Sequence, residues 1–327
     1  MRNLIVGLKG NLVNAERIIF EPKIPVYEVF LAAPPEISGN GRTGLPGTNL
    51  DLVYTISALA KKRNIRINVL INSVVLNPND LLGKFIDETC ERGIDSYTIA
   101  NYSVMKYLIE KRRRDKTPFS IILSTFMYIT TPADVRKYQE LLSPQDRIII
   151  NQNSNRNLNL LSEMVAETKI PLELFANTLC LQNCPDNVSN HAIFMANYSN
   201  KGEIRDPFFE NCMQRRITDP MLILSSPIIR PEDLELYEQM GFFFYKLGTR
   251  TFTTDQTLNI IKAYQSGSFQ GDISELNGTI NLGIAKKYPI PNPDLQGMIK
   301  RIFEGSGTPE TIYEEYLSKI RSLRWKL

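Results

Sequence analysis

Histidine and cysteine are scarce in this sequence, and it has neither a strong net charge nor a long apolar run. It contains one histidine and four cysteines in 327 residues, and its formal net charge is +3, which is too small to indicate nucleic acid binding by itself. No run approaches the roughly 18 apolar residues of a membrane helix. Residues 4–6 are apolar, but Lys9 and Asn11 interrupt them before the core of a signal peptide could form. We therefore expect a cytoplasmic protein with no membrane span.

The strand-like segments are short and apolar. Hydrophobic residues make up 43% of the chain, an ordinary proportion for a globular protein. Several segments are nearly continuous runs of Val, Ile, Leu, Phe and Tyr, as in a parallel sheet that is buried on both faces. The predicted strands are Leu4–Gly7, Val26–Ala32, Arg66–Ile71, Ser96–Ala100, Ser120–Ser124, Arg147–Asn151, Leu172–Ala176, Met221–Leu224 and Phe242–Lys246.

Amphipathic segments fill most of the intervals between these strands. Helices are predicted over residues 49–63, 79–92, 132–142, 157–168, 231–240 and 254–266. Thr48 or Asn49 is the expected N-cap of the first, and Thr131 precedes a proline at the first helical position of the third. Strands that alternate with helices imply βαβ units, and about eight such units predict an α/β fold, a TIM-like (β/α)8 barrel rather than an open sheet.

Two regions interrupt this alternation. Residues 177–220 follow a predicted strand and hold three cysteines and the histidine, so they are expected to form an enlarged βα loop at the C-terminal face of the barrel, where barrel active sites lie. The barrel is predicted over residues 1–275. Residues 276–327 would form a C-terminal extension with two short helices, near 294–304 and 309–323, that pack on the barrel or on a partner subunit.

The central constellation is Cys180-x3-Cys184-x6-His191-x20-Cys212. In the cytoplasm these cysteines are reduced thiols or metal ligands rather than disulfides. Thiolates suit soft metals and iron–sulfur clusters, and imidazole suits zinc or iron. Three thiols in one polar loop favour a metal site over three unrelated buried cysteines, whereas Cys90, near the end of an amphipathic helix, is predicted to be part of the core.

The identity of the metal stays open on spacing alone. The Cys-x3-Cys pair begins like the radical-SAM motif, but that motif needs a third cysteine three residues later, where this chain has Asn187. A structural zinc bound by three cysteines and His191 fits the spacing. His191 could instead support a ligand, or act as a base beside a catalytic thiol.

Other polar positions are weighed against ordinary structural roles. The segment 39–44 matches G-x-G-x-x-G, but Pro46 follows and no acidic residue lies about 20 residues on, so a rim loop in which Arg42 binds an anionic group is favoured over a dinucleotide site. Asn72, Asn151 and Asn153 follow strands, as turn residues do. The basic run 111–114 is predicted to be a solvated helix end.

The cysteine region resembles that of the peptidase U32 family. The similarity covers about residues 1–275 in arrangement and is most specific at 177–212 and 229–265. It lies in Asn177-Thr178-Leu179-Cys180-Leu181-Gln182-Asn183-Cys184-Pro185 with His191 and Cys212, in Ile229-Arg230-Pro231-Glu232-Asp233-Leu234 with Tyr237 and Gly241, in Lys246-Leu247-Gly248-Thr249-Arg250, in Ala263-Tyr264-Gln265, and in Ser124-Thr125 and Asn155-Arg156. The lysine and arginine of the family's Lys-Ile-Glu-Gly-Arg signature are in place, and its glycine is shifted.

This resemblance implies a TIM-like barrel that carries a [4Fe–4S] cluster on Cys180, Cys184 and Cys212. The well-studied hydroxylating members of the family use four cysteines, whereas this loop holds three, so the fourth iron position takes His191 or is open to substrate. The resemblance also implies that Lys246, Arg250 and Arg156 bind substrate or partner, and Asn177 is expected to face the barrel's active-site end.

Three functions follow from the resemblance. The first is oxygen-independent hydroxylation or a related modification of a small molecule, an RNA or a peptide, with a redox partner. The second is a metal-stabilised accessory or binding subunit that works beside a companion subunit. The third is a U32-type peptidase, for which the residues offer no recognisable protease triad.

Overall fold

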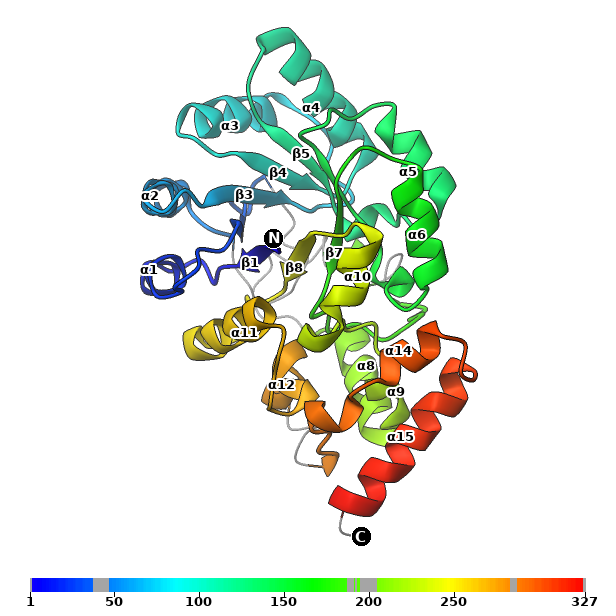
Figure 1. Cartoon of the computed structure of the whole chain (residues 1–327). Helices are drawn as coiled ribbons and strands as arrows, with labels where there is room; N and C mark the ends of the chain where they lie inside the picture. Colours follow the sequence, from blue (N-terminus) through cyan, green and yellow to red (C-terminus); the bar gives the residue numbers. More distant parts are fainter. Residues whose placement is uncertain are drawn as a thin grey trace.

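Eight parallel strands form a closed barrel in the computed structural model, with β1 hydrogen-bonded to both β2 and β8 (Figure 1). The structure describes residues 2–37, 47–186, 191, 193–194, 205–282 and 287–325. The strands are β1 (Asn3–Gly7), β2 (Glu28–Ala32), β3 (Arg66–Ile71), β4 (Ser96–Ile99), β5 (Ser120–Leu123), β6 (Arg147–Ile149), β7 (Leu172–Phe175) and β8 (Phe244–Leu247). The predicted α/β barrel is confirmed.

Helices surround this barrel, and most begin at a side-chain cap. Asn49 accepts from the backbone N–H of Leu52, and Thr131 forms a capping box with Asp134, as their positions predict. The helices are α1 (Leu12–Phe20), α2 (Leu50–Lys61), α3 (Asp80–Glu91), α4 (Tyr102–Asp115), α5 (Pro132–Gln139), α6 (Leu158–Ala166), α8 (Pro207–Thr218), α9 (Met221–Leu224), α10 (Leu234–Met240), α11 (Thr254–Ser266), α12 (Ile273–Asn277), α14 (Met298–Phe303) and α15 (Pro309–Arg324); the 3-10 turns are η1 (Thr125–Met127), η2 (Gln152–Ser154), η3 (Pro231–Asp233), η4 (Thr279–Leu282) and η5 (Asn292–Leu295).

The strand predicted at Met221–Leu224 is wrong, because these residues form the helix α9. A four-residue apolar run has no periodicity that separates a strand from a buried helical turn. Here Pro220 precedes the turn, and α9 packs against α15, which buries Ile223 and Leu224. Helices α1, α8 and α12 were not among the predicted segments, and of α4 only the helix end at 111–114 was predicted.

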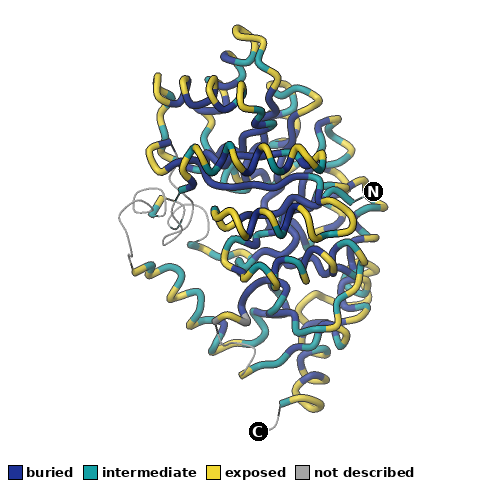
Figure 2. The backbone as a smooth tube through the Cα atoms, turned by 90° about the vertical axis from the view of Figure 1, so that its left-hand side faces the viewer, coloured by how far each residue is buried: buried dark blue, intermediate teal, exposed yellow. Residues whose placement is uncertain are grey.

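The apolar side chains of the strands divide between the two sides of the barrel wall. The larger cluster lies between the strands and the helices and includes Leu4, Val29 and Ile67. A second, separate cluster of Ile5, Phe30 and Leu70 lies inside the barrel. Neighbouring strand residues point to opposite faces, so this division follows from the alternation of positions. Figure 2 shows the buried strands running through the centre, while the helices alternate buried and exposed residues.

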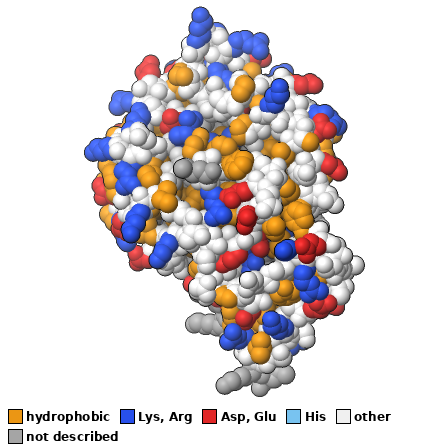
Figure 3. All heavy atoms as spheres, in the orientation of Figure 1, with side chains coloured by type: hydrophobic (Ala, Val, Ile, Leu, Met, Phe, Trp, Pro, Cys, Tyr) orange, Lys and Arg blue, Asp and Glu red, His pale blue; other side chains and the backbone are white. Residues whose placement is uncertain are grey.

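The C-terminal residues pack along α8 and α9 (Figure 1). The rings of Tyr288 and Trp325 pack at a tilt of 45° with centroids 4.9 Å apart, and the Tyr288 hydroxyl donates to the carbonyl of Ile217 at the end of α8. None of the described helices combines the length and the apolar character needed to cross a membrane. On the face drawn in Figure 3, basic and acidic side chains are interspersed.

Candidate active site at the barrel mouth

The barrel interior carries a buried ionic network. Arg147 on β6 donates through Nη2 to Glu28 on β2, and through Nε to Glu173 on β7 at 2.9 Å. Since β2 and β6 are not neighbouring strands, this contact crosses the interior. Glu28 also accepts from Ser96 Oγ at 3.1 Å and from Asn68 Nδ2 at 3.3 Å. The network therefore ties together strands on opposite sides of the barrel.

Lys246 on β8 lies close to this network but is not hydrogen-bonded to it. Within the described residues its Nζ makes no hydrogen bond or ion pair, and it lies 4.3 Å from the centroid of the Phe30 ring. Burial lowers the pKa of Lys246 to about 8; the charges of Glu173 and Glu28 oppose this shift, and those of Arg250 and Arg147 add to it. Lys246 is 8% exposed, whereas Glu28 and Glu173 are fully buried. Lys246 therefore lies between the buried ionic network and the solvent.

Aromatic rings and two glycines shape the barrel mouth, which is the end of the barrel where the strands terminate. A Cβ at Gly7 would lie 2.8 Å from Cζ of Phe30, and one at Gly248 would lie 2.6 Å from Cζ of Phe175. The two rings therefore lie directly against the backbone of the chain at these glycines. The Arg250 side chain passes the same place, because a Cβ at Gly7 would also lie 3.1 Å from Cγ of Arg250.

Two of the predicted substrate-binding residues make backbone contacts. Asn177 accepts from the N–H of Gly248 at 2.6 Å and donates to the carbonyl of Leu276 at 3.0 Å, which fixes the end of β8. Arg156 donates to the carbonyl of Ser226 through both Nε and Nη2. Arg42, the third such residue outside the signature, lies outside the described residues.

The cysteine loop, residues 177–186, follows β7 and is held by the loop after β6. Gln182 donates to the carbonyl of Asn153 at 2.7 Å, and the Asn153 side chain accepts from the N–H of Asn183 at 3.0 Å. Asn183 has a φ of 48°, a left-handed conformation that asparagine tolerates. The loop thus lies at the C-terminal face, where it was predicted.

The cysteines Cys180, Cys184 and Cys212 are half-buried, and none of the three is in a disulfide. Cys212 lies on α8, away from the other two in sequence. Burial raises the pKa of the Cys184 thiol; a backbone hydrogen bond at Asp186 opposes this shift, and the charge of Cys212 adds to it.

His191 is oriented by a carboxylate. Its Nε2 lies 2.9 Å from Oδ2 of Asp206, whose Oδ1 caps α8 by accepting from the N–H of Phe209 at 3.0 Å. The imidazole also lies against Phe208, with ring centroids 5.8 Å apart. His191 is thus attached to the beginning of the helix that carries Cys212.

Arg216, one turn after Cys212 on α8, is a buried guanidinium with no carboxylate partner among the described residues. It donates through Nη2 to the carbonyl of Leu179, the residue before Cys180, while Nε and Nη1 are buried without a partner. The other fully buried arginines, Arg147 and Arg230, are each paired with acidic residues. Sequence reasoning missed Arg216, although its i+4 spacing from Cys212 was a usable signal.

The residues of the cysteine loop and of α8 suit a metal–sulfur group in chemistry and in charge. The three thiols would supply soft ligands. Arg216, which bonds the carbonyl before Cys180, has two buried donors without a described partner, and an anionic group would compensate their charge. Within the described part of the chain, no three His, Cys, Asp or Glu side chains already converge on one point. The thiols would have to draw together around the group, and the ligand set stays a prediction.

Other predicted positions have structural surroundings. Cys90 is half-buried against the core and lies 3.3 Å from the Tyr97 hydroxyl. Lys111, in the basic run at the end of α4, is not solvated as predicted: it is 4% exposed and pairs with Asp87 at 2.6 Å and Asp115 at 3.0 Å. Its aliphatic stem is therefore covered, while acidic neighbours compensate its charge.

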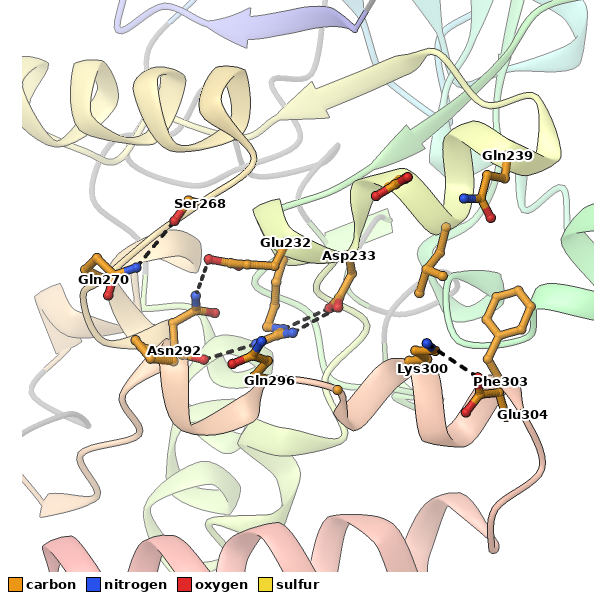
Figure 4. Close-up of a pocket in the computed structure, with 15 residues that line it drawn as sticks. Glu232, Asp233, Gln239, Ser268, Gln270, Asn292, Gln296, Lys300, Phe303 and Glu304 are labelled. Carbon is orange, nitrogen blue, oxygen red and sulfur yellow. Dashed lines mark hydrogen bonds and ion pairs between the residues drawn. The ribbon is translucent and has the colours of Figure 1, made fainter.

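A cavity of about 760 Å³ lies outside the barrel, between α10 and the segment of η5 and α14 (Figure 4). Its polar walls are largely paired with one another. Asn292 donates to Glu232 at 3.0 Å, and Arg230 bonds Asp233 through both Nε and Nη2. Arg230 also donates to the carbonyl of Asn292 at 3.0 Å. These contacts attach the C-terminal residues to the barrel.

No family model matches the chain. It is 25% identical over 258 residues to the "Uncharacterized protease MJ1657" of Methanocaldococcus jannaschii, which covers 76% of this chain and 75% of that protein. Its fold is similar to the U32 peptidase Mk0906, with a TM-score of 0.52, 11% identity, and coverage of 75% of this chain and 92% of that one. A protein from Aquifex aeolicus VF5 has a TM-score of 0.44 and 12% identity, over 82% of this chain and 93% of that one.

Proposed function

We propose that this chain, a divergent relative of the U32 peptidases, is a barrel enzyme that binds an iron–sulfur cluster between its cysteine loop and α8 and modifies a substrate at the mouth without oxygen. Cys180, Cys184 and Cys212 hold the cluster. His191 takes the fourth iron position, or that position is open to substrate. Hydroxylation without oxygen is a two-electron oxidation of the substrate, so a redox partner would accept the electrons that the substrate releases. Zinc bound by the same residues is the competing assignment.

The observation that carries this proposal is the pairing of thiols with an uncompensated buried cation. A buried guanidinium without a counter-ion costs several kcal/mol, and Arg216 is in that position among the described residues. Arg216 lies one turn after Cys212 on α8, and its Nη2 donates to the carbonyl of Leu179, the residue before Cys180. Thiolate ligands on a cluster carry the negative charge that would compensate it, which neutral thiols do not.

The chain's own residues have separate tasks in this proposal. When bound, the cluster supplies an electron-transfer centre or a Lewis-acidic iron. Asn153 anchors the loop through its two bonds to Gln182 and Asn183. Lys246 and Arg250 place positive charge at the mouth, where it would bind a carboxylate or phosphate of the substrate. Arg156, Asn177 and Arg42 remain predicted substrate contacts, and the first two already position the loops that surround the mouth.

Anaerobic purification tests the assignment. The wild-type protein is expected to be brown, with about four irons and matching sulfide per chain. Replacing Cys180, Cys184 or Cys212 by alanine should abolish the colour, while Cys90→Ala, a matched control outside the loop, should keep it. Circular dichroism verifies that each variant is folded. A colourless wild-type protein with stoichiometric zinc would overturn the proposal. Colour that survives in each of the variants at Cys180, Cys184 and Cys212 would also overturn it.

A thiol peptidase is the second candidate, favoured by the His191–Asp206 pair. A carboxylate that orients an imidazole is the arrangement that activates a nearby thiol, and the M. jannaschii relative carries the name of a protease. Peptidase activity would need no cluster. Hydrolysis of a casein-derived fluorogenic peptide by metal-free protein, lost in His191→Ala and reduced in Asp206→Asn, would support it; no hydrolysis by the metal-free wild-type protein would exclude it for that substrate.

A further inference from the structure

Lys246 carries a buried amine that makes no hydrogen bond or ion pair within the described residues. The interior holds two buried carboxylates, Glu28 and Glu173, but Arg147 bonds both of them. Glu173 Oε1 is buried without a hydrogen-bond partner, yet no ion pair joins it to Lys246 in the described part of the chain. A lysine that served only to balance the charge of this network would be expected to bond to that oxygen.

The surroundings of the amine make its neutral form more populated than in an ordinary lysine. Its Nζ lies over the Phe30 ring, which Gly7 allows to lie against β1. Arg250 and Arg147 add two positive charges nearby, and burial together with these charges lowers the pKa of Lys246 to about 8. Desolvation and a neighbouring cation are the two conditions that activate lysine as a nucleophile.

The amine is also accessible from the mouth. Lys246 is aligned with Phe175 on β7 and with Ile5 on β1, above the level of Glu173, which is aligned with Phe244. Its residual exposure of 8% contrasts with 0% for Glu28 and 1% for Glu173. A small molecule that approaches from the mouth would therefore reach Lys246 before it reached Glu173.

We propose that Lys246 is an amine nucleophile that forms an imine with small carbonyl compounds carrying an anionic group. The anionic group would be attracted by the positive charge of Arg250 beside Gly7. The neutral nitrogen attacks the carbonyl carbon, both protons of the amine pass through solvent to the carbonyl oxygen, and that oxygen leaves as water. The carbon–nitrogen double bond replaces the carbon–oxygen one, with no net oxidation. Hydrolysis of the imine reverses the step. The reaction requires no metal, so it can be tested independently of the proposed cluster.

Reductive trapping tests this directly. The full chain is incubated at pH 7.5 with glyoxylate, the smallest aldehyde that bears a carboxylate, and with sodium cyanoborohydride; peptide mapping then compares Lys246 with Lys300, whose side chain is 66% exposed. With a pKa of about 8 rather than the ordinary value of about 10.4, the neutral fraction of Lys246 is about two-hundredfold larger. We expect Lys246 to be labelled at least about tenfold faster.

Three variants serve as controls for this test. Lys246→Arg retains the charge and should lose the fast label, whereas Lys300→Arg should leave it unchanged. Because the charge of Glu173 raises the pKa of Lys246, Glu173→Gln should move the labelling midpoint to lower pH, which access alone would not do. If Lys246 in the folded wild-type protein is labelled no faster than Lys300, or if the midpoint is unmoved in Glu173→Gln, the proposal is wrong.

Discussion

Replacing Arg147 by methionine would remove the cation that Glu28 and Glu173 share. Breaking a buried ion pair by removing one partner costs about 3–5 kcal/mol, because a buried charge is left uncompensated. Glu28 would keep Ser96 and Asn68 as donors, whereas Glu173 would lose its only described hydrogen-bond donor. We therefore expect the free energy of unfolding at pH 7, measured in urea, to fall by an amount in this range.

The loss should depend on pH and on the two carboxylates. Burial raises the pKa of Glu173, and Arg147 opposes this shift; without Arg147 the pKa rises further. A protonated carboxyl avoids the penalty, so the deficit of the variant should be largest above this raised pKa and should shrink as the pH falls. Adding Glu28→Gln and Glu173→Gln should recover most of the loss. A deficit under about 1 kcal/mol at pH 7, or no recovery in the triple variant, would refute the reasoning.

Gly248→Ala would bring a Cβ to within 2.6 Å of the Phe175 ring; overpacking of this kind should cost about 1–3 kcal/mol in urea unfolding. Arg230→Met would leave Asp233 buried without its cation; we expect a loss of about 3–5 kcal/mol and faster proteolysis of the C-terminal residues, and unchanged proteolysis would contradict the anchoring role. Arg216→Met should weaken retention of iron and sulfide after anaerobic purification, and equal retention would remove the electrostatic support for the cluster.

The barrel could be predicted from the sequence because its strands are short apolar runs separated by capped amphipathic helices. The eight strands and the helices at 49–63, 79–92, 132–142, 157–168, 231–240 and 254–266 lie where the pattern places them. Met221–Leu224 was misassigned because burial against α15, a tertiary contact, determines its conformation. Four apolar residues alone do not distinguish a strand from a turn of helix.

The ion pairs inside the barrel could not be predicted from the sequence. Glu28, Arg147 and Glu173 each stand in a short apolar strand, and an ionisable residue in such a strand could have been singled out. Their pairing could not, because Glu28 and Arg147 are 119 residues apart and meet only when the barrel closes. Lys246 was found through the signature it shares with the U32 family. That its amine lacks an ion pair depends on where Arg147 and the Phe30 ring lie in the folded barrel.

Anomalous X-ray diffraction from crystals grown anaerobically tests the central claim most directly. Data collected on either side of the iron absorption edge should show one strong site at the barrel mouth, within bonding distance of the sulfur atoms of Cys180, Cys184 and Cys212. An anomalous signal that appears at the zinc edge instead, or an iron site away from these three sulfur atoms, would contradict the account.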